Sequence, residues 1–405
     1  MKKIAIFAAA MMAASAASAA DLASKKPVEA ADYVKICDAY GAGFFYIPGG
    51  ETCLKIGGYV RYDLLFGVHN DGHASGGRIG AGWAARGGNG TFTRARAQVN
   101  FDARTNTEAG LLRSYINLQF NGDSAGTGGL TVDRAFIQWG GLTAGRTASM
   151  FDFWTGNAME PIFGTASSDY TTNLLAYTAA FGNGVSATLS VEDGTFRRVG
   201  GTYGGHKLPD LVANVNVTQA WGSAQVMGAV HQIYNGNTRA AGADNILGTA
   251  DDVFTGGTGS KAGWAVGAGA TVNVPFLGAG SSLSLQAAYA NGAIAYLSDN
   301  IASGADYSVV GTAIKATTGY SIAGGLNIVL NPKLSLAFDG SYMSIDPAGA
   351  SNTVTQWDLA ASASYEATPG LTFTLGLDYE NVKDKAVGGV DGNALAGSFR
   401  IQRTF

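Results

Sequence analysis

The stretch TRARAQVNFDAR, residues 93–104, alternates polar and apolar side chains without a break. Ala95, Val99 and Phe101 fall on one face, and the other face carries only arginine, glutamine, asparagine and aspartate. The segments 54–66 and 112–121 on either side repeat the pattern. Alternation with a period of two residues indicates β-strands rather than helices. A soluble β-sandwich alternates in the same way, so this pattern alone does not place the strands in a membrane.

The connections between the strands favour a transmembrane barrel. Short turns, such as Gly140-Gly141 and Asn331-Pro332, alternate with long loops rich in glycine and serine. Short periplasmic turns, longer outer loops and an even number of strands are typical of bacterial outer-membrane barrels. We predict an all-β fold, a transmembrane antiparallel up-and-down β-barrel of sixteen strands, with fourteen or eighteen strands as alternatives. The strands are expected at 53–67, 91–104, 108–121, 129–139, 142–148, 173–181, 184–193, 209–220, 222–234, 262–274, 281–292, 316–330, 333–345, 352–366, 370–382 and 394–405.

The first residues predict export. Lys2 and Lys3 precede an apolar run that is shorter than the ~20 residues of a membrane-spanning helix, and small residues follow it. A membrane-anchoring helix is the alternative to a cleaved leader. We expect a signal peptide at 1–19, cleaved after Ala19 or Ala20, then a periplasmic N-terminal segment at 20–52 and the barrel at 53–405.

Composition excludes several classes of function. Charged residues make up 14% of the chain, against about 25% in a typical soluble domain. The formal net charge of −4 becomes −6 when Lys2 and Lys3 leave with the leader, and no basic block occurs, which argues against a nucleic-acid partner. No nucleophile elbow, metalloprotease motif or nucleotide-binding loop is present, so we expect neither an enzyme nor a cofactor.

Residues 32–63, which read DYVKICDAYGAGFFYIPGGETCLKIGGYVRYD, closely resemble the opening of the alphaproteobacterial porin family. Weaker matches follow at 136–139, at 144–147 and at 399–403. The resemblance implies a homotrimer of sixteen-stranded diffusion channels whose third long loop, about 149–172, folds into the lumen. It implies an outer-membrane location reached through the periplasm, with lipid and lipopolysaccharide as neighbours, and small hydrophilic solutes and ions as the molecules that pass.

Cys37 and Cys53 are the only two cysteines. An even count in an exported chain predicts a disulfide.

The charge pattern of the lumen is expected to come from two sets of residues. The third long loop carries Asp152, Glu160 and Asp169 and contains no lysine or arginine. If it folds inward, it faces the inward-facing basic residues of the first five strands across a narrow lumen, and such an arrangement sets ion preference. In the alternative interpretation the arginines are solvated lumen residues that pair with Asp63, Asp102 and Asp133. The basic residues are Arg61, Arg94, Arg96, Arg113, Arg134 and Arg146, together with Lys55.

We therefore expect a passive, water-filled porin that selects by size and charge. A substrate-specific channel of the sugar type would need a file of lumen-facing aromatics, of which Tyr59, Tyr115 and Phe136 are too few. A surface barrel with an adhesin or structural role would act through its long loops. No metal is expected, apart from a weak calcium candidate in the fifth long loop at Asp244, Asp251 and Asp252.

Overall fold

The computed structural model describes residues 35–405 except 72–87, 125, 127, 160–162, 202, 206, 247–248, 252, 257–258, 302, 312 and 386–390. The signal peptide expected at 1–19 lies outside the described residues. Among the residues that are described, no helix is long and apolar enough to cross a membrane.

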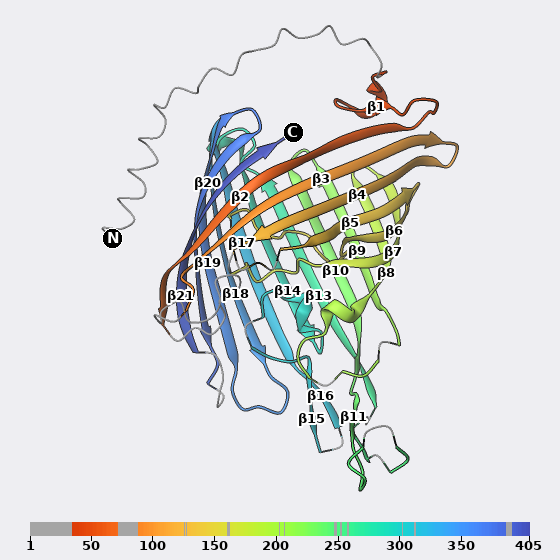
Figure 1. Ribbon diagram of the computed structural model, residues 1–405, viewed down its shortest axis with the longest axis vertical. Coiled ribbons are helices and arrows are strands. Elements are labelled where there is room, and N and C mark those ends of the chain that lie inside the picture. The colour runs from red at the N-terminus through yellow and green to blue at the C-terminus, as the bar shows by residue number, and fades with distance from the viewer. Residues whose placement is uncertain are drawn as a thin grey trace.

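Sixteen antiparallel strands form a closed barrel (Figure 1). Each strand pairs with the next along the chain, and the last strand pairs with the first, so the ring has no free edge. The strands are β2 (Cys53–Asp71), β3 (Thr91–Thr107), β4 (Gly110–Asp123), β5 (Leu130–Trp139), β6 (Leu142–Ala148), β7 (Thr171–Gly182), β8 (Val185–Glu192), β9 (Asp210–Gln219), β10 (Gly222–Tyr234), β13 (Ser260–Asn273), β14 (Ser282–Asn291), β17 (Thr318–Asn331), β18 (Leu334–Asp346), β19 (Val354–Thr368), β20 (Leu371–Lys383) and β21 (Asp391–Thr404).

The predicted fold class and the number of strands are confirmed. Most strand ends lie within three residues of the predicted ones, and the largest difference is at β2, which continues to Asp71. Two outer loops also contain structure that the sequence pattern did not predict. These loops form the hairpins β11 (Asn237–Ala240) with β12 (Val253–Gly256) and β15 (Tyr307–Val310) with β16 (Ala313–Ala316). Their strands are only four residues long, too short for periodicity to separate them from a loop.

The two faces of the barrel differ in polarity as the alternation predicts. Large apolar side chains such as Val226, Leu285 and Leu359 are more than half exposed on the outer face. Six aromatics that lie beside the short turns or near the C-terminus are also exposed, from 41% at Trp221 to 83% at Phe276. Apolar surface bounded by aromatics is typical of a lipid-facing barrel. The full set of these aromatics is Trp139, Phe181, Trp221, Phe276, Tyr365 and Phe405.

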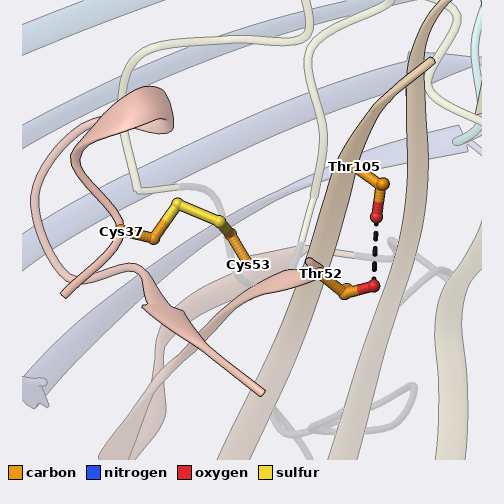
Figure 2. The surroundings of a disulfide bond; sticks show 4 residues. All are labelled: Cys37, Thr52, Cys53 and Thr105. Atoms are coloured by element: carbon orange, nitrogen blue, oxygen red, sulfur yellow. Dashed lines mark hydrogen bonds between the residues drawn. A yellow bond between two sulfur atoms is a disulfide. The ribbon is translucent and has the colours of Figure 1, made fainter. Parts of the chain in front are cut away.

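The segment 35–52 lies at the end of the barrel that carries the short turns and the C-terminus (Figure 1). A disulfide joins Cys37 to Cys53 at the start of β2, with the two Cα atoms 6.0 Å apart (Figure 2). Strand β1 (Phe45–Tyr46) pairs with the first residues of β2, and the Thr52 and Thr105 hydroxyls are 3.1 Å apart. The predicted disulfide is confirmed, and it holds this segment against the foot of β2.

Candidate pore and constriction

The segment 149–170 between β6 and β7 is called the inward loop because its described residues, 149–159 and 163–170, lie inside the barrel. Strand β6 has only seven residues, so the chain leaves the wall partway along the barrel. Glu192, on the inner face of β8, accepts hydrogen bonds from the Ser149 hydroxyl at 2.6 Å and from the Met150 amide at 2.8 Å. These bonds turn the chain away from the wall and into the lumen.

Inward-facing side chains on the far side of the barrel hold the inward loop through its backbone amides. Asp339 on β18 accepts the amides of Asn157 and Ala158 at 2.5 Å each. Hydrogen bonds from a backbone amide to an ionised carboxylate are stronger than neutral ones. The other bonds run from Trp154 to Gln286 on β14, from Met159 to Ser362 on β19, from Phe163 to Asp378 on β20 and from Ala166 to Ser341 on β18.

This loop divides the lumen into a covered side and an open side. The carboxylates beneath it, such as Asp339, Asp378 and Glu380, are at most 5% exposed. On the opposite wall the side chains of Arg113 and Arg134 are 23% and 43% exposed. Solvent inside the barrel therefore contacts the basic wall more than the acidic one.

The inner faces of β2 to β5 carry the arginines that the sequence assigns there. Most of them form ion pairs with aspartates on the same or the neighbouring strand. Arg96 instead donates to the Asn121 side chain at 2.6 Å and makes no ion pair with a described residue. The carboxylates Asp63, Asp102 and Asp133 all take part, so the pairing interpretation of these arginines holds alongside their position on the lumen wall. The pairs are Arg61–Asp63 at 3.1 Å, Arg94–Asp123 at 2.5 Å, Arg113–Asp102 at 2.9 Å and Arg134–Asp133 at 3.8 Å.

Arg146 does not belong to this wall, and the expectation that it faces the lumen is wrong. It pairs with Ala135 and Asn173, whereas the preceding residue, Gly145, pairs with the lumen-facing Phe136. Period-two alternation therefore places Arg146 on the outer face of β6 with Leu142, which is 38% exposed. The Arg146 guanidinium donates to the Val132 carbonyl oxygen at 3.1 Å.

Two arginines that the sequence analysis left out of the site join the wall. Arg104 pairs with Asp102 at 2.8 Å, and Arg400 on β21 pairs with Asp63 at 2.6 Å. The apolar residues Phe399 and Ile401 flank Arg400, so alternation in the last strand was the available signal. We call the lumen-facing set the arginine wall: Arg61, Arg94, Arg96, Arg104, Arg113, Arg134 and Arg400.

The three acidic residues predicted in the third long loop have different surroundings. Glu160 lies outside the described residues. The Asp152 side chain is 6% exposed and pairs with Arg197 at 3.2 Å, so it does not face the arginine wall as expected. Burial raises the pKa of the Asp152 carboxyl to about 6, although the Arg197 charge opposes the shift. Asp169 contacts the solvent inside the barrel. Partial desolvation by the surrounding protein raises the pKa of its carboxyl, and the charge of Arg134 opposes that shift.

A further lumen carboxylate comes from the outer loop between β14 and β17. Asp299 is exposed, and a Cβ atom on Gly164 of the inward loop would lie 3.7 Å from its Oδ1 atom. Asp299 contacts the solvent of the lumen, but the surrounding loops partly desolvate its carboxyl, and this desolvation together with the nearby Asp169 carboxylate raises its pKa to about 7. No sequence pattern predicts this residue in the lumen, because 130 positions separate it from Asp169.

The structure does not strengthen the hypotheses of a sugar channel or of a calcium site. Tyr115 and Phe136 stack with ring centroids 5.3 Å apart on the lumen face, and the Arg113 guanidinium lies over both rings. This pair is too short for the file of aromatics that a sugar channel needs.

In the fifth long loop Asp251 accepts hydrogen bonds from Thr249 and from the amide of Asp244, and Asp252 lies outside the described residues. No group of three metal-ligating side chains occurs in the described part of the chain.

A closed antiparallel barrel with an apolar outer face and a charged inner face defines a transmembrane β-barrel of the bacterial outer membrane. Among such proteins, this chain belongs to the porin family: residues 21–401 match the Porin subfamily. Porins are channel proteins rather than enzymes.

Curated relatives agree with this assignment, and solved structures share the fold. The porin Omp2b of Brucella abortus (strain 2308) is 37% identical over 234 residues, which cover 53% of this chain and 61% of the relative. Omp2b of Brucella melitensis is 36% identical over the same shares. The matched region thus spans less than two thirds of these relatives. The outer-membrane channel DcaP of Acinetobacter baumannii shares the fold with a TM-score of 0.68 and 17% identity, over 89% of this chain and 99% of that one. The anion-selective porin of Comamonas acidovorans shares it with a TM-score of 0.55 and 11% identity, over 88% and 100%.

Proposed function

We propose that the protein forms a water-filled channel through which small hydrophilic solutes and ions diffuse passively. The observation that carries the proposal is the arginine wall, which lines an enclosed lumen opposite a loop held inside the barrel. Charged side chains facing inward in a membrane protein mark a path for water and ions. The family and the relatives named as porins support the same function.

We further propose that the inward loop and the arginine wall form the narrowest part of the channel. Asp169 and Asp299 supply the negative side, and Arg96 and Arg134 supply the positive side. Charges in a confined lumen are screened less than in bulk water, so a few side chains suffice to set ion preference.

Two measurements on the purified protein test the channel function. In planar bilayers it should give discrete current steps whose size increases with salt concentration. In liposomes it should admit small neutral sugars and exclude larger ones, because the inward loop narrows the lumen. A protein that inserts into the bilayer but passes neither ions nor sugars would contradict the proposal and would favour a structural or adhesive role.

We also propose that the barrel works as a homotrimer in the outer membrane, surrounded elsewhere by lipid and lipopolysaccharide. Strands β6 and β8 have seven and eight residues, fewer than the ~9–11 that a tilted strand needs to cross a bilayer. Arg146 adds a charge to the outer face of the same wall, where contact with lipid is unfavourable. A neighbouring subunit against this wall would cover the short strands and keep Arg146 away from lipid. A measurement of the native mass in mild detergent tests the proposal.

A further inference from the structure

Among the described residues, Arg197 is the largest of the fully buried side chains, and it belongs to no part of the barrel wall. It lies in the short 3₁₀ turn η3 (Gly194–Arg197), within the outer loop between β8 and β9. The alternation of the strands gives no reason for a buried arginine at this position. Burying a guanidinium is unfavourable unless its charge and its donors are matched, so its contacts indicate its role.

The first set of contacts reaches both ends of the inward loop. One guanidinium nitrogen of Arg197 donates to Asp152 Oδ1 at 3.2 Å, and the other donates to Ser168 Oγ at 2.6 Å. The guanidinium also lies 4.2 Å from the centroid of the Tyr170 ring. Asp152 in turn accepts the Ser168 hydroxyl at 2.5 Å and the Tyr170 amide at 2.8 Å. Arg197 therefore joins the point where the loop enters the lumen to the point where it leaves.

The second set of contacts reaches the outer loop that carries Asp299. Arg197 donates to the carbonyl oxygen of Ala295 at 3.0 Å, and its guanidinium lies 4.1 Å from the centroid of the Tyr296 ring. Both of these residues belong to the loop between β14 and β17. The Tyr296 hydroxyl donates to Asp210 at the start of β9 at 2.7 Å. The Arg197 guanidinium thus lies close to two aromatic rings, one from the inward loop and one from the loop of Asp299. It also donates hydrogen bonds to acceptors on each of these two loops.

The geometry points to Arg197 as the positioning residue of the constriction. It fixes the inward loop and the loop of Asp299 relative to each other, and so determines where Asp169 and Asp299 stand opposite the arginine wall. This inference rests on the proposed channel function. A planar guanidinium suits the task because its rigid donors address several acceptors while its face stacks on aromatic rings. A lysine carries the same charge, but its ammonium group has neither the rigid set of donors nor a planar face that stacks on a ring.

The test compares Arg197→Ala and Arg197→Lys with Arg198→Ala. Arg198 is a matched control because it is the next residue and carries the same charge, but it contacts Gly204 and Tyr203 of its own loop. Backbone amide hydrogen exchange in 149–170 is measured by mass spectrometry on the folded protein, and single-channel conductance is measured in planar bilayers. The exchange measurement does not depend on whether the protein conducts.

Arg197→Ala should accelerate exchange in 149–170 by at least about tenfold, the factor that corresponds to one lost charge-assisted hydrogen bond. Its conductance should be larger and noisier than that of the wild type. Arg197→Lys should show most of this change, and Arg198→Ala should match the wild type in both measurements. If Arg197→Ala fails to assemble, Arg197→Lys and Asp152→Asn provide the same comparison.

Exchange in 149–170 that is equal in the Arg197 variants and in Arg198→Ala would overturn the inference. A wild-type protein that passes no current, with accelerated exchange in the Arg197 variants, would contradict the channel function and leave the positioning role intact. Accelerated exchange with unchanged conductance would show that the inward loop does not limit the current, and this would overturn the link between Arg197 and the constriction.

Discussion

At the scale of single residues, the raised pKa of Asp299 predicts that ion preference changes with pH. An ordinary aspartate stays ionised well below pH 6, but Asp299, with a pKa of about 7, loses its charge as the pH falls through neutrality. Asp152 follows near 6, while the arginines stay charged, so acidification should shift the reversal potential in a salt gradient towards anion preference. In Asp299→Asn most of the shift above pH 6 should disappear, and an unchanged titration in this variant would contradict the assignment.

Alternation along the strands predicts most of the arginine wall but not the carboxylates opposite it. Arg96 can be placed in the lumen because Ala95 and Ala97 flank it in a long strand. Arg146 is harder to place, although Leu142 and Ala144 fix its face, because a strand of seven residues gives few positions to count. The surroundings of Asp152 and Asp299 are set by residues far away in the sequence, and local patterns do not contain that information.

At the scale of elements, the sorting of short turns and long loops was enough to predict the barrel and the ends of its strands. The path of the inward loop was implied by family resemblance alone. Its anchors are Asp339, Asp378 and Gln286, which lie on strands more than 120 residues away. Predicting these contacts requires knowing which strands face one another across the closed ring, and alternation within one strand does not supply this.

The short strands β6 and β8 lead to a prediction about assembly. Ala144 on β6 faces outward, in the wall that we assign to the subunit interface. Ala144→Trp should therefore weaken the trimer, because a large ring would hold the two walls apart. Ala287→Trp, on the outer face of β14, should leave the trimer intact because the ring would enter lipid. Native mass measurement in mild detergent compares them, and equal masses for both variants would place the interface elsewhere.

At the scale of the whole molecule, the lumen has two unlike sides. Asp339 on β18 and Asp378 on β20 are covered by the inward loop, whose amides they bind, whereas the arginine wall remains open to water. Asp169 on the inward loop and Asp299 on the loop between β14 and β17 place negative charge on the open side of the lumen. The channel that we propose is thus narrowed between a fixed row of arginines and a smaller number of carboxylates carried on loops.

The most direct test of this account is the reversal potential in a salt gradient of three variants in planar bilayers. Asp169→Asn should shift it towards anion preference and Arg96→Ala towards cation preference, because each removes one charge from an opposite side of the constriction. Asp251→Asn, in the outer loop between β11 and β12, should have little effect, because 0.1 M salt screens exposed charges over ~10 Å. Opposite shifts for the first two variants are the predicted result. Unchanged reversal potentials for both would show that the narrowest part of the pore lies elsewhere.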